Sequence, residues 1–357
     1  MLRRFKLNPP KFILAILLMG FGAIAIYYLN QTKLIIAGSN YTSIAILASG
    51  LVFFMGIVII VQMFENETLL AIVLLAPSVI AVAIFVYGFI GWSIRVSLSK
   101  WKGLLPDYTW AGISQYIYLF NDPRFRIDVR NTVIFTIGFI AGCLILGLGL
   151  AILLDQRLRG EAIFRGIFLF PMAISFIASG VVWSWLMNPA TGNRITGINL
   201  IFHSLGLDFL ISQWHSSPQP WGMVFTVMPA VWQLSGFTMA LYLGGIRSIS
   251  EDIREAARVD GATEIEIYRF VILPMLQPVT LSAVIILAHM SLKIFDLIVA
   301  LGHKDLRLDV PGIYMWTTTF DGYNYAQGAA IGILMLVSVA ILVVPYLVQN
   351  MRTETEL

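Results

Sequence analysis

This sequence has very few cysteines and few charged residues. Its 357 residues include one cysteine, Cys143, which excludes an internal disulfide framework and a cysteine-rich metal site. The four histidines lack a ligand spacing such as H-E-x-x-H, so no metal site is expected. Charged residues make up 12% of the chain, about half their share in soluble domains. The net charge of +3 comes from scattered residues, which excludes nucleic-acid binding.

Apolar residues are what the sequence has in excess. They make up 58% of the chain, and the mean hydropathy is +0.83. A soluble fold needs enough polar surface to cover its core, and long stretches of this chain carry no charge at all. The composition therefore predicts a protein that crosses a membrane several times.

Apolar runs long enough to span a bilayer recur along the chain. A helix needs about 20 residues to cross the hydrocarbon, because its backbone groups must be satisfied internally there. The runs lack the two-residue alternation of barrel strands, so we predict an all-α membrane protein with about eight transmembrane helices and both termini on one side. The predicted spans are 12–29, 43–63, 69–93, 131–154, 164–187, 222–246, 278–300 and 325–349.

The distribution of basic residues predicts the orientation. Four of them lie between Arg3 and Lys11, ahead of a first span that we interpret as an uncleaved helix. The positive-inside rule then places both termini in the cytoplasm, together with segments 155–163 and 247–277. The segment 94–130 falls outside, although it is also basic. Residues 1–68 hold almost no polar intramembrane residues, so we expect a two-helix membrane extension there and the functional part in 69–357.

The most charged stretch is the predicted cytoplasmic segment 247–277. Ser250 is a suitable N-cap for a helix that begins with acidic residues, and that helix should end at Gly261. Thr263 can cap a second short helix, which should stop at Pro274 before the seventh span. The sequence therefore predicts a helix, a glycine turn and a second helix at the membrane surface.

This stretch also carries a spaced motif. Glu255-Ala256-Ala257 is followed by Gly261, Val271 and Leu273-Pro274. The spacing resembles the EAA loop of ABC-importer permeases, with valine where that pattern usually has isoleucine. The resemblance extends over residues 69–357 and includes the segment from Lys293 to Asp296 in the seventh span.

The resemblance implies a fold and a set of partners. The fold would be the six-helix core of a type I ABC-importer permease plus the N-terminal helix pair, similar to the larger permease of maltose-type importers but without its folded insert in segment 94–130. The chain has no G-x-x-x-x-G-K-[ST] motif, so ATP and Mg would be bound by a partner, and this chain would not be an enzyme. The expected partners are a second permease, two ATPase subunits and an extracytoplasmic sugar-binding protein, at the cytoplasmic (inner) membrane of a prokaryote.

In the family the EAA loop docks on the ATPase and drives alternating access. We expect Glu255 to offer a charged contact, the two alanines to permit close approach, and Gly261 to form a tight turn that a side chain would obstruct. Two arginines on the flanks are candidate ion-pair donors. The expected coupling residues are Arg254, Glu255, Ala256, Ala257, Arg258, Gly261, Leu273 and Pro274.

Polar residues inside two spans are candidates for the substrate path. His289, Lys293 and Asp296 are spaced to share one face of the seventh span, where Lys293 and Asp296 either form an internal pair or line the path. In the sixth span, an amide, a hydroxyl and an aromatic ring could hold a sugar. These residues are Gln233, Ser235 and Phe237.

The function predicted in this way is import of a sugar, driven by ATP and dependent on a binding protein. One alternative within the class is import of a polyol or a glycerol phosphate. Another class is a proton-coupled secondary transporter with His289, Lys293 and Asp296 as its relay, but the EAA spacing then has no explanation. An intramembrane enzyme is disfavoured because no nucleophile–base or metal constellation is visible.

Overall fold

The computed structural model describes residues 9–33, 40–63, 66–156, 160–190, 192–302 and 305–355. In these ranges the chain is helical and has no strand, apart from an isolated bridge between Ser99 and Trp110. The expected all-α fold is confirmed. The basic residues at positions 3, 4 and 6 lie outside the described residues, and so do those at 157 and 159.

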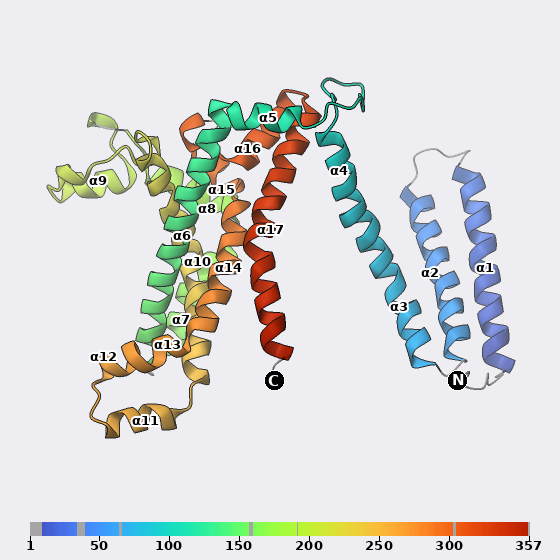
Figure 1. Cartoon of the computed structure of the whole chain (residues 1–357), viewed down its shortest axis with the longest axis horizontal. Coiled ribbons are helices and arrows are strands. Elements are labelled where there is room, and N and C mark those ends of the chain that lie inside the picture. The colour runs from blue at the N-terminus through green and yellow to red at the C-terminus, as the bar shows by residue number, and fades with distance from the viewer. Residues whose placement is uncertain are drawn as a thin grey trace. The chain divides into compact units, whose positions relative to one another are not determined.

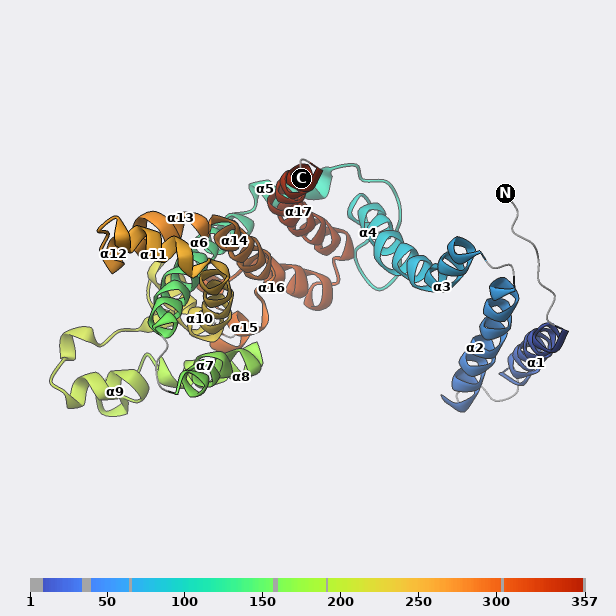
Figure 2. The same cartoon turned by 90° about the horizontal axis from the view of Figure 1, so that it is seen from below.

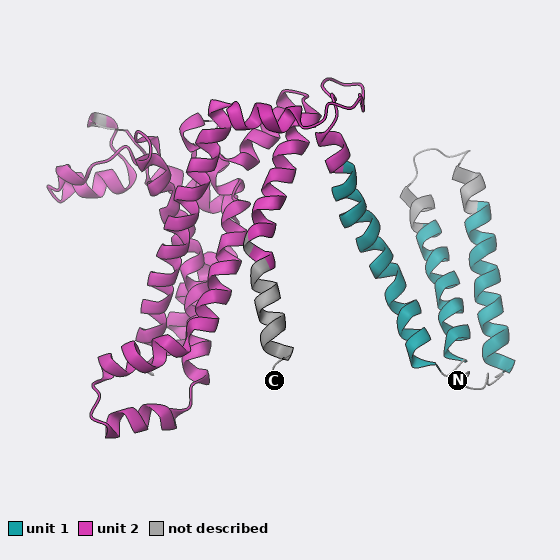
Figure 3. Ribbon diagram, in the orientation of Figure 1, with its two compact units in different colours: residues 1–92 teal, residues 93–357 magenta. Residues whose placement is uncertain are grey.

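The chain forms two compact units, residues 1–92 and 93–357, which are coloured separately in Figure 3. We describe each by itself. The boundary between the units follows Trp92, whereas the sequence analysis divides the chain after residue 68. Membership of 69–92 in the six-helix core therefore stays a prediction.

The first unit is built from long apolar helices. They are α1 (Pro9–Lys33), α2 (Asn40–Gln62), α3 (Glu67–Val82) with the π-helical turn η1 (Ala83–Gly88), and the start of α4 (Phe89–Ser97). Helices α1 and α2 meet at glycines: a Cβ on Gly22 would lie 2.8 Å from the Phe53 Cβ, and one on Gly56 would lie 2.5 Å from the Met19 Cγ. Small residues let helices approach closely in a bilayer, where apolar surface alone gives no drive to associate.

Two long helices form the centre of the second unit: α6 (Pro123–Asp155) and α10 (Trp221–Ser248), which run side by side in Figures 1 and 2. Asp122 caps α6, and Pro123 occupies its first turn, where a missing N–H costs nothing. Glycines again allow the two helices to approach closely, because a Cβ on Gly142 of α6 would lie 2.6 Å from the Val231 side chain of α10. The two helices therefore pack almost backbone to backbone.

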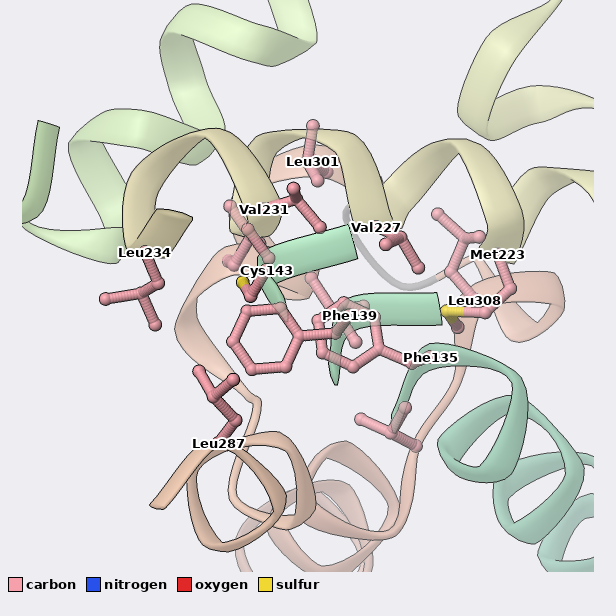
Figure 4. Packing of buried hydrophobic residues seen from close by; sticks show 14 of the residues in the cluster. Phe135, Phe139, Cys143, Met223, Val227, Val231, Leu234, Leu287, Leu301 and Leu308 are labelled. Carbon is pink, nitrogen blue, oxygen red and sulfur yellow. The ribbon is translucent and has the colours of Figure 1, made fainter. Parts of the chain in front are cut away.

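Three hydrophobic clusters lie in this unit, the smallest of them around Leu119, Phe125 and Tyr314. Near the end that carries α16, the rings of Phe135 and Phe139 stack with centroids 5.5 Å apart, and Val231 and Leu287 pack around them (Figure 4). Toward the other end, α6 and α10 enclose residues from the segment after α11. Cys143 is fully buried in the first cluster and is a free thiol.

Several spans are bent, which the sequence analysis did not predict. Helix α7 (Glu161–Leu169), with the 3-10 turn η2 (Phe170–Ala173), meets α8 (Phe176–Leu186) at 98°. Likewise, the helical path α12 (Glu264–Glu266), η6 (Ile267–Ile272) and α13 (Leu273–Met275) meets α14 (Gln277–Leu292) at 63°. The predicted span over 164–187 is thus present as two helical pieces joined at a sharp bend.

Among the residues that the structure describes, five helices are long and apolar enough to cross a membrane, or up to seven if each bent pair is one span. The eighth predicted span lies in α17 (Tyr325–Thr355), whose described apolar stretch, Tyr325–Ile341, is shorter. The remaining elements are short: α5 (Ser114–Asn121), η3 (Gly192–Arg194), α9 (Gly197–Ser204), η4 (Asp208–Leu210), η5 (Trp214–Ser216), α11 (Glu251–Val259), α15 (Asp296–Gly302), η7 (Leu306–Leu308), α16 (Pro311–Trp316) and η8 (Thr317–Asp321).

The second unit has two distinct ends. Helices α11, α12 and α13 lie at one end, and α5 and α16 lie at the other (Figure 1). The predicted cytoplasmic segment 247–277 is thus far from the predicted outside segment 94–130. This separation is what a membrane-spanning arrangement with loops on both sides requires.

The closest backbone approach provides a test of the packing. A Cβ on Gly236 would lie 1.9 Å from the Phe168 carbonyl oxygen, whereas one on Gly244 in the same helix meets nothing within 4 Å. We expect Gly236→Ala to push α10 away from α7 and to cost about 1–3 kcal/mol. Gly244→Ala should be neutral or slightly stabilising. Thermal unfolding of the purified variants checks this, and equal midpoints would contradict the packing.

Candidate functional site

The segment from Ser250 to Met275, which we name the coupling element, begins with a well-capped helix. The Ser250 hydroxyl accepts a hydrogen bond from the Asp252 N–H at the start of α11. The helix ends in a Schellman motif, in which the Ala262 N–H donates to the Ala257 carbonyl and the Gly261 N–H donates to the Arg258 carbonyl. The predicted helix boundaries at Ser250 and Gly261 are confirmed.

Gly261 is required for backbone reasons. Its φ is +85°, a conformation that L residues adopt at a cost, and a Cβ there would meet no atom of this chain within 4 Å. A side chain would therefore project outward. Any obstruction of the kind predicted from the sequence must come from a partner.

The turn is held on its far side by a second cap. Thr263 and Glu266 form a capping box at the start of α12. Arg258 reaches across the turn, donating to Glu264 at 2.8 Å and to Glu251 at 3.1 Å. These hydrogen bonds, the one to Glu264 foremost, raise the pKa of Arg258. The guanidinium group therefore stiffens the element.

One largely buried ion pair joins the coupling element to the bundle. Arg254 in α11 donates to the Asp155 carboxylate, the last residue of α6, at 2.8 Å, and the two side chains are 11% and 7% exposed. The same carboxylate oxygen accepts from the Tyr268 hydroxyl at 2.7 Å, and Arg254 also donates to the Ile246 carbonyl of α10. Three separate segments thus meet at Asp155.

A second ion pair lies beside the first. Arg247, near the end of α10, donates to Glu161 at the start of α7 at 2.8 Å. Together with Asp155 and Arg254, these residues line an open polar pocket of about 900 Å³ between α11 and the helix ends. The ends of α6, α7 and α10 are therefore all connected at this face.

Apolar anchoring accompanies the ion pairs. Ile267 and Ile272 of η6 are almost completely buried between α6 and α10, and Leu273 packs against the same cluster. Pro274 is exposed, one residue before α13 ends and the chain bends. Ala257 also packs inward, while Ala256 faces out.

The outward face of the coupling element is left open. Within the described part of the chain, the Glu255 carboxylate has no hydrogen bond or ion pair. Along the same segment Val259 is 87% exposed and Ile265 is 80% exposed, and Phe270 is exposed as well. Exposed apolar side chains and an unpaired charge on one short element are typical of a protein-binding surface.

One candidate in the sixth span, Gln233, contacts the bend of the fifth. Gln233 is buried and donates to the Ile174 carbonyl at 2.6 Å, at the point where α7 and α8 diverge. Ser235 is buried and bonds weakly to its own helix, and Phe237 is half-buried. Gln233 therefore satisfies a carbonyl that the bend frees.

The candidates in the seventh span are not brought together as predicted. Helix α14 ends at Leu292, Lys293 follows it, and Asp296 begins α15, so His289, Lys293 and Asp296 do not share one helix face. In the described residues Lys293 and Asp296 form no ion pair, and both are exposed. The single-face prediction is wrong because the helix breaks inside the predicted span.

Sequence reasoning missed two residues that hold the site together, Asp155 and Tyr268. Asp155 follows an apolar stretch, and Tyr268 lies within the charged segment 247–277 with no distinguishing pattern around it. Asp155 is 99 residues from Arg254 and 113 residues from Tyr268 along the chain, so no local spacing could reveal the contact. The one available signal was an acidic residue directly after the fourth predicted span.

Comparison with known proteins assigns the family. Residues 143–353 match the family of binding-protein-dependent transport system inner membrane components. The chain belongs to this family. It is a membrane permease subunit of an ABC transporter, and the resemblance found in the sequence is confirmed. The matched range contains α10, the coupling element and α14.

Individual relatives agree with this assignment. A probable ABC transporter permease of Pyrococcus horikoshii is 40% identical over 79% of this chain and 96% of its own length. The xylose/arabinose import permease protein XacH of Haloferax volcanii is 32% identical over 75% of this chain and 84% of its own. A solved bacterial ABC transporter for import of the polysaccharide alginate has the same fold, with a TM-score of 0.65 and 21% identity over 78% of this chain and 94% of that one.

The link between α11 and α6 can be tested by removing one side of it. Arg254→Ala leaves the buried Asp155 with Tyr268 alone, and we expect a loss of about 2–4 kcal/mol in stability. Arg258→Ala removes exposed ion pairs and should cost clearly less. Thermal unfolding in detergent measures both. Equal losses would mean that burial at Asp155 contributes nothing.

Proposed function

We propose that this chain is the permease subunit of an ATP-driven sugar importer, and that its coupling element docks on a separate ATPase. The observation that carries the proposal is the division of the element into two faces. One face is fixed to α6 and α10 through Asp155 and the buried isoleucines, and the other presents Glu255 and exposed apolar groups. A surface built in this way can receive a force and pass it to the spans.

The motion follows from these attachments. When the ATPase dimer closes, the docked element is displaced, and the Arg254–Asp155 pair carries that displacement to the end of α6. The Arg247–Glu161 pair links the neighbouring ends of α10 and α7. The close packing of α6 and α10 makes them move as a rigid body. ATP drives the change only as far as it binds the closed dimer more tightly than the open one.

The assembly that we propose contains a second permease, two ATPase subunits that hold ATP and Mg, and an extracytoplasmic sugar-binding protein. The coupling element then faces the cytoplasm, together with both termini. Support comes from the family, whose description names a binding protein, and from the open docking face.

A sugar is the proposed substrate because named relatives import xylose and arabinose, trehalose and maltose, or alpha-glucosides. A polyol or glycerol phosphate is the alternative, and another relative transports sulfoquinovosyl glycerol. An anionic substrate would favour several unpaired cations along the path, and Lys293 alone offers little. A proton relay has little support, since its three residues lie on separate segments.

Purification through a tag on this chain tests the function. The complex should carry an ATPase subunit with it. Its ATP hydrolysis in lipid should rise with one sugar-loaded binding protein from a panel. Absence of an ATPase under mild conditions, with uptake driven by a proton gradient, would overturn the proposal.

The docking turn has its own test in Gly261→Asn. Asparagine tolerates a positive φ, so the chain should still fold, but the side chain would project into the docked partner. We expect at least about a tenfold loss of sugar uptake and reduced co-purification of the ATPase, which corresponds to about 1.4 kcal/mol of lost interaction. Gly206→Asn is the matched control, because Gly206 also has a positive φ and open space but lies outside the coupling element. Equal behaviour of the two variants would contradict docking at Gly261.

A further inference from the structure

The first turns of α6 carry a buried carboxyl group that the proposed coupling mechanism does not use. Asp128 is completely buried, and within the described part of the chain no donor group reaches either of its carboxylate oxygens. Buried polar side chains nearly always have a hydrogen-bond partner, and an uncompensated buried charge is strongly unfavourable. An ionised Asp128 would be such a charge.

The polar group that faces Asp128 is a second buried carboxyl group. Asp309 lies between η7 and α16, is 2% exposed, and has its carboxyl group within hydrogen-bonding reach of Asp128. Two ionised carboxylates can only accept hydrogen bonds and repel each other, whereas a protonated carboxyl group donates one. The contact between the two groups is therefore favourable only when the pair holds a proton.

The cation at this site is already engaged by Asp309. Arg124 donates to the Asp309 carboxylate at 2.5 Å and to the Thr317 hydroxyl at 3.0 Å, and its guanidinium group lies over the Tyr314 ring. The Val310 N–H donates to the other oxygen of the same carboxylate. These donors suit an ionised Asp309, so Asp128 is the group that needs the proton.

The surroundings favour a proton over other occupants. Asp122 also acts on Asp128, and it is acidic as well. A buried water could donate to Asp128 but would leave its charge in place. A metal ion needs more oxygen ligands than two carboxylates supply, and among the described residues no group of three acidic, histidine or cysteine side chains could hold one.

The other titratable groups on neighbouring elements have contacts of their own. His215 of η5 lies near Asp305 and Arg307. The hydrogen-bonded pairs are Arg307 with Asp305, Tyr314 with Asp122, and Tyr116 of α5 with Ser97.

We infer that Asp128 and Asp309 form a proton-binding site, in which Asp128 holds the proton at neutral pH and donates a hydrogen bond to Asp309. The site joins α6 to the segment ahead of α16, where Asn131 also donates to the carbonyl oxygens of Arg307 and Asp309, both at 2.9 Å. Loss of the proton would bring two negative charges into contact and weaken this link. The end of the unit opposite the coupling element is thereby sensitive to pH, whichever molecule the permease transports (Figure 1).

The first test is the pH dependence of unfolding in the complex purified through this chain. The folded chain keeps a proton at Asp128 that an unfolded chain releases, so its stability should fall as the pH rises from about 5 to about 9. Asp128→Asn keeps a donor toward Asp309 and does not titrate. The difference between the thermal midpoints of the two proteins should therefore change by about 2–4 °C over this range. Labelling of the buried Cys143 by a thiol-reactive dye follows the unfolding of this chain.

Infrared spectroscopy of the same complex detects the proton directly. At neutral pH the unmodified complex should show the carbonyl band of a protonated carboxylic acid, and Asp128→Asn should lose it. Asp260→Asn is the matched control, because Asp260 is an exposed aspartate and its replacement should leave both the band and the pH dependence unchanged. If Asp128→Asn does not assemble, Asp128→Ser takes its place, since its hydroxyl can also donate to Asp309.

Three results would contradict the proton-binding site. The first is absence of the acid band from the unmodified complex at neutral pH. The second is persistence of the full band in Asp128→Asn. The third is stabilisation of the unmodified complex, but not of Asp128→Asn, by sodium chloride and not by choline chloride, which would mark a bound cation.

Discussion

The largely buried carboxylate of Asp155 is the contact on which the attachment of the coupling element depends. It sits at the end of the longest central helix and accepts hydrogen bonds from Arg254 and Tyr268, which come from two parts of the coupling element. A buried carboxylate without these donors would cost several kcal/mol of stability, in the range of about 3–5 kcal/mol. Loss of either donor alone is therefore unfavourable. The element is therefore fixed to the bundle by the cost of separating charges as much as by apolar packing.

The helices to which the coupling element is attached are themselves tightly packed. Glycines on α6 let α10 approach until side chains touch backbone, and the stacked rings of Phe135 and Phe139 fill the space beyond. Densely packed helices have low compressibility, so they are displaced as a unit and do not deform gradually. In the proposed mechanism, motion at α11 would therefore be passed along whole helices, and the helix direction changes at the bends near Ala173 and Leu276.

Local signals in the sequence were enough to predict the spans and the helix boundaries of the coupling element. Long apolar runs predicted the spans, and Ser250, Gly261 and Thr263 predicted the helix boundaries of the coupling element, because caps and turns depend on neighbouring residues. The break after Leu292 could not be predicted, since neither glycine nor proline lies there and the apolar run continues beyond it. The pairing of Arg254 with Asp155 depends on the folded bundle and has no local pattern.

The open space around Gly261 has an evolutionary consequence. The groups that hold the turn in shape, such as Arg258 and the Thr263 cap, are different from the side chains that stand in the open, such as Glu255, Val259 and Ile265. Substitutions at the open positions alter no contact within this chain's own core. If the open positions meet the ATPase as proposed, related permeases can diverge in which ATPase they accept while their internal architecture stays constant, and these positions should vary in step with the ATPase surface that they contact.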